Sequence, residues 1–222
     1  MKERPILFNG PMVRGVLSGQ KTVTRRVMKN QPCRLPKLVE NGGANFWANP
    51  LYIQGASMGS QMHTCPYGQP GDLLWVREVF GLQVRHYGGG TGEHIVYRAT
   101  KPDAIYCKSA EGQEYPVKWK PNTHMPRRSS RILLEITDVR VERLRDSADL
   151  ALLDELGDML DDCDSVAGKE FSRIEHLQSA GAPLRMLPEM YGFKAYWDKL
   201  NGAGSFDANP WVWVVEFKRV AP

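Results

Sequence analysis

The longest strand-type stretch of this chain covers residues 131–143, and its pattern changes halfway along. The apolar residues first lie on one face of an extended strand and then on the other: Ile132, Leu134 and Ile136, followed by Val139 and Val141. Side chains alternate between the two faces of a strand, so one extra residue reverses the alternation. We therefore predict one long strand, or two joined strands, with a bulge or bend near Asp138.

Of the other periodic segments, the first and the last in the chain are of the strand type. Strand-type patterns cover residues 5–8, 21–26, 73–80, 93–99 and 211–219. Helix-type patterns cover residues 12–17, which end at Gly19, and also residues 146–160 and 190–200. The order contains no strand–helix–strand rhythm of the parallel type and no internal repeat. We predict an α+β protein with a mixed β-barrel and peripheral helices.

Two segments are expected to be loop-rich insertions. Residues 31–68 are rich in Gly, Pro and Asn, and residues 101–128 contain Trp119 and the sequence His124-Met125-Pro126. Residues 168–188 are also weakly patterned. A length of 222 residues suits one domain with long insertions or two small domains. We expect a single domain over residues 1–222.

Composition and charge narrow the class of protein. The chain is 42% hydrophobic and 24% charged, as in globular proteins with a buried core. It has no apolar run of the roughly 20 residues needed to cross a bilayer and no signal-peptide pattern, so we expect a cytoplasmic protein without a membrane partner. A net charge of +4 tolerates a nucleic-acid partner without requiring one. The charge is segregated, with basic residues crowding residues 14–29 and 127–131 and acidic residues crowding residues 146–164.

The four cysteines predict neither a disulfide scaffold nor a zinc ribbon, because they are scattered and include no Cys-x-x-Cys pair. Cys33, His63 and Cys65 match the spacing of metal ligands, but such spacing is easily met by chance. We expect no metal and no other cofactor.

The first candidate site is the basic segment of residues 19–26, Gly-Gln-Lys-Thr-Val-Thr-Arg-Arg. Directly after a helix end the strand alternation can break, which would let a lysine and a threonine converge. A lysine whose pKa is lowered by burial can accept the proton of a hydroxyl group. The alternative interpretation is a solvated basic edge strand.

The second candidate site lies in residues 70–78, Pro-Gly-Asp-Leu-Leu-Trp-Val-Arg-Glu. Both faces of this strand are largely apolar, so Arg77 and Glu78 sit at the end of a buried strand. Charges in such a place are normally paired or functional. A structural ion pair and a role in a site both fit the pattern.

Two further groups of residues have plain structural explanations. The acidic residues Asp154, Glu155 and Asp158 most simply form a solvated helix face. Trp211 and Trp213 could stack on nucleic-acid bases, but tryptophans on a closing strand more often belong to the core. The chain also lacks a phosphate-binding loop, a dinucleotide fingerprint, a Gly-x-Ser-x-Gly elbow and a His-Glu-x-x-His motif.

Taken together, these segments resemble the ASCH domain family, in particular its long bacterial and prophage members. The matching stretches run nearly end to end: residues 5–8 with Met12, then 19–26, 70–78, 124–126, 131–144 and 209–217. The Gly-x-Lys-Thr-x-Thr-x-Arg element, the Gly-Asp pair before a strand and the terminal Val-x-x-Phe strand are jointly specific. The resemblance implies a PUA-like fold, similar to that of RNA-binding PUA domains, with a cleft where the motifs meet.

The resemblance also implies residues for a site. Some small bacterial members are amidohydrolases that remove the acyl group from N4-acetylcytidine with a lysine, a threonine and a glutamate. The motif places the first two on Lys21 and Thr24, and the helix after the long strand places the third on Glu155. Relatives often have Glu-Gly there, whereas this chain has Glu-Leu-Gly, so Asp154 and Asp158 remain alternatives. The implied ligand-binding residues are Arg25, Arg26, Trp75, Arg77 and Glu78.

Three functions are compatible with these features. The first is an amidohydrolase acting on N4-acylated cytidine-type nucleosides. The second is a non-catalytic protein that binds RNA or a modified nucleobase, and the third is a ribonuclease, for which the sequence offers no dedicated histidine pair. We expect a nucleoside or RNA partner and favour a monomer. The two insertions are absent from the smallest family enzymes and are expected to cap or reshape the cleft.

Overall fold

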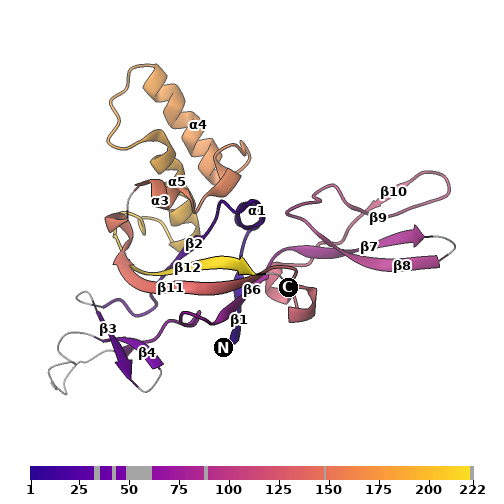
Figure 1. Ribbon diagram of the computed structural model, residues 1–222. Coiled ribbons are helices and arrows are strands. Elements are labelled where there is room, and N and C mark those ends of the chain that lie inside the picture. The colour runs from indigo at the N-terminus through magenta and orange to yellow at the C-terminus, as the bar shows by residue number, and fades with distance from the viewer. Residues whose placement is uncertain (33–35, 42–43, 49–61, 88–89, 148, 221–222) are drawn as a thin grey trace.

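The centre of the protein is an open five-stranded sheet. The computed structural model describes residues 1–222 except 33–35, 42–43, 49–61, 88–89, 148 and 221–222 (Figure 1). In spatial order the strands are β1 (Glu3–Leu7), β6 (Leu73–Arg77), β11 (Leu133–Arg143), β12 (Trp211–Val220) and β2 (Val23–Val27). The pair β1–β6 is parallel, and the other neighbours are antiparallel.

The α+β class is confirmed, but the described strands do not close into the predicted barrel. Strands β1 and β2 are the two edges of the sheet, and no backbone ladder between described residues joins them. A side chain bridges them instead, because Arg26 on β2 donates a 2.9 Å hydrogen bond to the carbonyl oxygen of Leu7 on β1.

The predicted bulge in the longest strand is confirmed. The register between β11 and β12 shifts between Ile136 and Asp138. Ile136, Val139 and Val141 therefore pair with Phe217, Val215 and Trp213, which share one face of β12. The extra residue thus keeps both apolar rows of β11 on the same face of the sheet.

The tryptophans of β12 belong to the core, as the structural interpretation predicted. Trp211 and Trp213 are both buried. The Trp213 ring packs edge-on against Trp47 of β4 (Ala44–Ala48), with 4.9 Å between the ring centroids. This contact holds the small sheet of β3 (Lys37–Asn41), β4 and β5 (Met62–His63) on one side of the central sheet, opposite the helices (Figure 1). Residues 31–68 thus contain a sheet, where we expected a partly irregular segment.

Strands β7–β10, residues 80–116, project from the central sheet as an arm (Figure 1). The expected strand of residues 73–80 ends earlier, at Arg77, and Phe80 begins a new strand. The arm consists of the hairpin of β7 (Phe80–Tyr87) with β8 (Gly90–Tyr97), and the hairpin of β9 (Ile105–Lys108) with β10 (Glu114–Pro116). Two 3-10 turns, η1 (Asn122–His124) and η2 (Arg127–Ser129), return the chain to β11.

Helix α1 (Gly10–Ser18) begins two residues before the predicted segment of residues 12–17 and ends at Gly19, as predicted. The side chain of Asn9 accepts a hydrogen bond from the amide of Met12, which caps the N-terminus. Gly19 adopts a left-handed conformation with φ of 79°, which ends the helix and turns the chain toward β2.

The later helices differ from the predicted ones. The helix expected over residues 146–160 is broken into η3 (Leu144–Asp146), α3 (Asp149–Leu153) and η4 (Gly157–Met159). Gly157 has a φ of +58°, which is incompatible with a continuous right-handed helix. The weakly patterned residues 168–188 contain most of α4 (Val166–Ser179), capped by the Ser165 side chain, and α5 (Pro188–Asn201) lies where a helix was predicted. Among the described residues, no helix combines the length and apolar character needed to span a membrane.

Candidate functional site

Lys21 and Glu155 form a buried ion pair. The lysine Nζ donates to Glu155 Oε2 over 2.8 Å, and the two side chains are 0% and 4% exposed. Lys21 follows the turn after α1, and its amide donates to the carbonyl of Gly15 over 3.0 Å. A Cβ atom on Gly15 would lie 3.1 Å from the Lys21 Cβ, so the glycine allows the lysine to pack directly against the helix.

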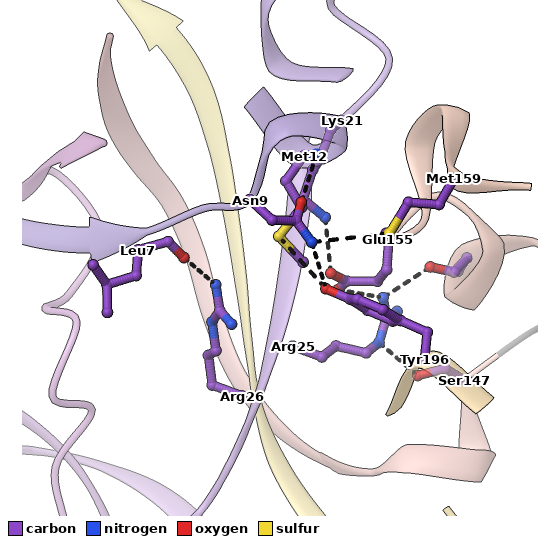
Figure 2. A network of polar contacts seen from close by, with 11 residues as sticks. Leu7, Asn9, Met12, Lys21, Arg25, Arg26, Ser147, Glu155, Met159 and Tyr196 are labelled. Carbon is purple, nitrogen blue, oxygen red and sulfur yellow. Dashed lines mark hydrogen bonds and ion pairs between the residues drawn. The ribbon is translucent and has the colours of Figure 1, made fainter. Parts of the chain in front are cut away.

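Arg25 brings a second cation to the same carboxylate. Its Nη1 lies 3.3 Å from Glu155 Oε1 and also donates to the carbonyl of Ala151 over 2.8 Å. Its Nε donates to the hydroxyl of Ser147 over 3.2 Å. Both cations approach Glu155 from the β2 side, as Figure 2 shows. The cluster therefore holds two cationic side chains around one carboxylate, with little access to water.

Burial lowers the pKa of Lys21 below its ordinary value of 10.5. The Glu155 carboxylate raises this pKa, and the positive charges of Arg26 and Arg25 lower it further, but desolvation is the largest effect. A lowered pKa increases the fraction of Lys21 that is neutral at a given pH, and the neutral amine can accept a proton. Buried ion pairs contribute little net stability, so such a cluster beside a cavity is a candidate functional site.

A cavity of about 180 Å³ lies beside this cluster. One wall is polar and includes Arg25, Arg26 and Glu155, while helix α5 supplies an aromatic wall. The full lining consists of Met12, Arg25, Arg26, Glu155, Phe193, Tyr196, Trp197, Leu200 and Asn201.

The aromatic wall is fixed to the start of α1. Asn9 Nδ2 donates to the hydroxyl oxygen of Tyr196 over 3.3 Å, while that hydroxyl lies 3.8 Å from the sulfur of Met12 (Figure 2). Burial raises the pKa of Tyr196, so its phenol is neutral near pH 7. Asn9, Tyr196 and the α5 wall were not among the residues predicted for the site. The aromatic-rich pattern of residues 190–200 was visible, but nothing local indicated which cluster it faces.

Thr24 is completely buried on β2, and its hydroxyl has no hydrogen-bond partner among the described residues. Side chains alternate along β2, so Thr24 shares a face with Arg26 and points away from the face of Arg25. Thr24 does not line the described cavity. The alternative of a solvated basic strand does not describe this segment, because Lys21, Thr24 and Arg25 are all buried.

Of the three acidic residues considered for the glutamate role, Glu155 contacts Lys21. Asp154 is exposed, and Asp158 forms a two-bond ion pair with Arg14 on α1. The side chains of Arg14 and Asp158 are 39% and 42% exposed.

The other proposed ligand-binding residues have separate partners. The Arg26 guanidinium lies 5.8 Å from the centroid of the Phe8 ring and bonds to the Leu7 carbonyl (Figure 2). The rest lie elsewhere: Glu78 accepts two hydrogen bonds, of 2.8 and 2.9 Å, from Arg131, and Arg77 lies over the Trp75 ring and donates to the Thr123 carbonyl. None of Trp75, Arg77 and Glu78 lines the described cavity beside Glu155.

In the part of the chain that the structure describes, no three His, Cys, Asp or Glu side chains are grouped so as to hold a metal ion. Cys33 lies outside the described residues, and Cys65 and His63 are both buried. Comparison of the chain with protein-family models, curated proteins and solved structures found no match. The site is therefore interpreted from its own residues and from the motif resemblance.

Proposed function

We propose that this protein is an amidohydrolase of the ASCH type, which removes the acyl group from N4-acylated cytidine-type nucleosides. In this proposal the central sheet is a PUA-like core, and residues 31–68, which contain the small sheet of β3–β5, and residues 101–128 are insertions. The observation that carries the proposal is the 2.8 Å contact between Lys21 and Glu155, fully buried beside a cavity. It joins the lysine and the glutamate that the motif resemblance implies.

The proposed reaction uses Thr24 as the nucleophile and Lys21 as its base. The neutral Lys21 amine takes the Thr24 hydroxyl proton as the oxygen attacks the acyl carbon. Collapse of the tetrahedral adduct breaks the carbon–N4 bond, and Glu155 relays the lysine's proton to the departing cytosine amine. Water then attacks the acyl-threonine ester as Lys21 takes one of its protons, and the bond between the acyl carbon and the Thr24 oxygen breaks as Lys21 returns that proton to the Thr24 oxygen. The products are the free nucleoside, the carboxylic acid and the regenerated enzyme.

The side chains that line the cavity suit the pyrimidine ring and the acyl group of the proposed substrate. The rings of Phe193, Tyr196 and Trp197 offer an apolar wall for the face of a pyrimidine. Arg26 carries further N–H donors besides the one bonded to Leu7, and these suit the developing oxyanion of the acyl group. A volume of about 180 Å³ suits one small ring better than a whole nucleotide, so the ribose would lie at the opening.

The test is a mass-spectrometric assay of N4-acetylcytidine hydrolysis. The wild-type protein should release cytidine, and Lys21→Ala and Thr24→Val should each release none while remaining folded by circular dichroism. Asp158→Asn is the matched control, because it removes a neighbouring carboxylate that bonds to Arg14 and not to Lys21. Undiminished turnover by Lys21→Ala would refute the assignment.

One observation favours a second candidate function. Thr24 does not line the described cavity, whereas the arginines and the aromatic wall do. A pocket of this composition can bind a modified nucleobase without chemistry. Titration calorimetry that detects N4-acetylcytidine binding, with no cytidine released after prolonged incubation, would identify a binding protein.

A further inference from the structure

A second region of the chain has its own chemical character and takes no part in the proposed reaction. Between Glu114 and Glu135 the sequence contains no acidic residue. The same interval holds Lys118, Lys120, His124, Arg127, Arg128 and Arg131. It connects the arm to β11 and passes through the turns η1 and η2.

Part of this interval forms a groove of about 590 Å³ against the base of the arm. One wall comes from β7 and β8, and the other comes from residues 119–129. The lining residues are Phe80, Leu82, Ile95, Trp119, Lys120, Pro121, His124, Pro126, Arg128 and Ser129. The described lining therefore combines aromatic and apolar surface with Lys120, His124 and Arg128, and it includes no acidic side chain.

The basic side chains of the groove can contact a ligand, and Lys120 Nζ also lies 5.9 Å from the centroid of the Phe80 ring. Lys120, His124 and Arg128 are exposed, and none of them forms an ion pair with a described residue. Arg127 and Arg131, by contrast, are paired with Glu3 and Glu78. Trp119 is half-buried and lines the groove, and its ring packs close to β7, where a Cβ atom on Gly81 would lie 3.3 Å from Trp119 Cε3.

The groove is held in shape by contacts with the arm. Lys120 and Phe80 exchange two backbone hydrogen bonds, of 2.7 and 3.3 Å. A Cβ atom on Gly81 would lie 2.3 Å from Val117, so this glycine allows the wall to approach β7 closely. At the other end, the Tyr97 hydroxyl donates to the carbonyl of Ser129 over 3.0 Å. A ligand would therefore meet a preformed surface, which reduces the entropic cost of binding.

The groove and the Glu155 cavity adjoin the same end of β1. Asn122 in η1 donates to the carbonyl of Phe8 over 3.3 Å, and Arg26 at the cavity donates to the neighbouring carbonyl of Leu7. Leu7 itself is 43% exposed. A chain-like ligand seated in the groove could thus extend toward the cavity.

We propose that this groove binds single-stranded nucleic acid. Bases of a single strand expose their faces and can stack on Trp119, which duplex bases cannot do. The phosphates would lie against Lys120 and Arg128, whose positive charge complements the nucleic-acid backbone, and His124 offers a ring N–H as a hydrogen-bond donor. The inference does not depend on the amidohydrolase reaction, because no groove residue lies in the Lys21–Glu155 cluster.

The test is fluorescence anisotropy with a labelled oligouridylate of about 12 nucleotides at about 50 mM salt. The wild-type protein should bind it more tightly than a duplex of the same length. Lys120→Glu combined with Arg128→Glu should weaken binding about tenfold or more and reduce the salt slope by about 1.4, because each lost phosphate contact removes about 0.7. Trp119→Leu, checked for folding by circular dichroism, should weaken binding about 5- to 100-fold through the loss of one stacked base.

Two controls make the result specific. Lys169→Glu combined with Arg185→Glu makes the same charge change at exposed positions away from the groove, and it should leave the affinity within about twofold. Lys21→Met should bind the oligonucleotide as the wild type does, which separates failure of this inference from failure of the amidohydrolase proposal. Absence of binding, equal binding of the duplex, or equal losses in the groove and control variants would overturn the proposal.

Discussion

Lys21 Nζ lies 2.8 Å from Glu155 Oε2, although 134 positions separate the two residues. Both segments that carry the pair pack closely against helix α1. Gly15 lets Lys21 pack against the helix, and Gly157 places the turn after Glu155 so close to α1 that an added Cβ would lie 3.2 Å from the carbonyl oxygen of Pro11. The pair is therefore positioned by two glycines that allow close packing around one helix.

Replacing Glu155 by Gln should destabilise the fold strongly. The substitution leaves Lys21 and Arg25 buried without their shared anion, and removing one partner of a buried ion pair costs about 3–5 kcal/mol. Asp158→Asn breaks an exposed pair with Arg14 and should cost about 0–1 kcal/mol. Urea unfolding of the two variants measures both values, and similar losses would show that the buried pair is not special.

The pH dependence of the proposed hydrolysis follows from Lys21. Burial lowers its pKa below 10.5, and the reaction needs the neutral amine, so kcat/KM should rise with pH through this lowered pKa and then level off. The folded state also releases this proton at lower pH than the unfolded chain does, so the contribution of Lys21 to stability rises with pH between the two pKa values.

The variant Lys21→Arg also tests whether the neutral amine of Lys21 acts as the base. The arginine keeps a positive charge beside Glu155 but does not deprotonate, so the variant should be inactive at every pH. A pH–rate profile that is flat or falls across this range in the wild type would contradict the role of Lys21 as a base.

Two substitutions at Asn9 distinguish the effect of its bond with the Met12 amide from the effect of its bond with the Tyr196 hydroxyl. Asn9→Ala removes the N-cap of α1 and should lower the free energy of unfolding by about 1 kcal/mol. Asn9→Ser retains a capping oxygen and should preserve most of that stability, but it loses the amide that donates to Tyr196. Both variants should therefore weaken N4-acetylcytidine binding by calorimetry, while urea unfolding distinguishes them. Equal destabilisation by both would argue against the cap.

The cysteines should react with iodoacetamide in a fixed order. Cys163 is exposed, whereas Cys65 is buried and its thiol pKa is raised to about 11 by desolvation. At about pH 8 very little Cys65 is thiolate, so peptide mapping should find Cys163 alkylated first and Cys65 only after unfolding. Rapid alkylation of Cys65 in the native protein would show that residues 62–68 do not pack as described.

The sequence predicted the elements whose signals are local. The bulge near Asp138 follows from a change of alternation, and the end of α1 follows from Gly19. Helix α4 was missed because its residues are mostly polar, and its cap at Ser165 is a single residue in an irregular stretch. The expected helix of residues 146–160 ends at Leu153, and the positive φ of Gly157 prevents it from continuing to residue 160.

The pairing of distant segments was decided by tertiary structure. The sequence predicted strands over residues 5–8 and 21–26, where the structure has β1 and β2, but it did not indicate that both lie at edges of an open sheet. The residue types around Glu155 indicated only a solvated acidic face, yet the carboxylate is buried between Lys21 and Arg25. Periodicity records which side of an element faces the interior, whereas the identity of its neighbour depends on the path of the whole chain.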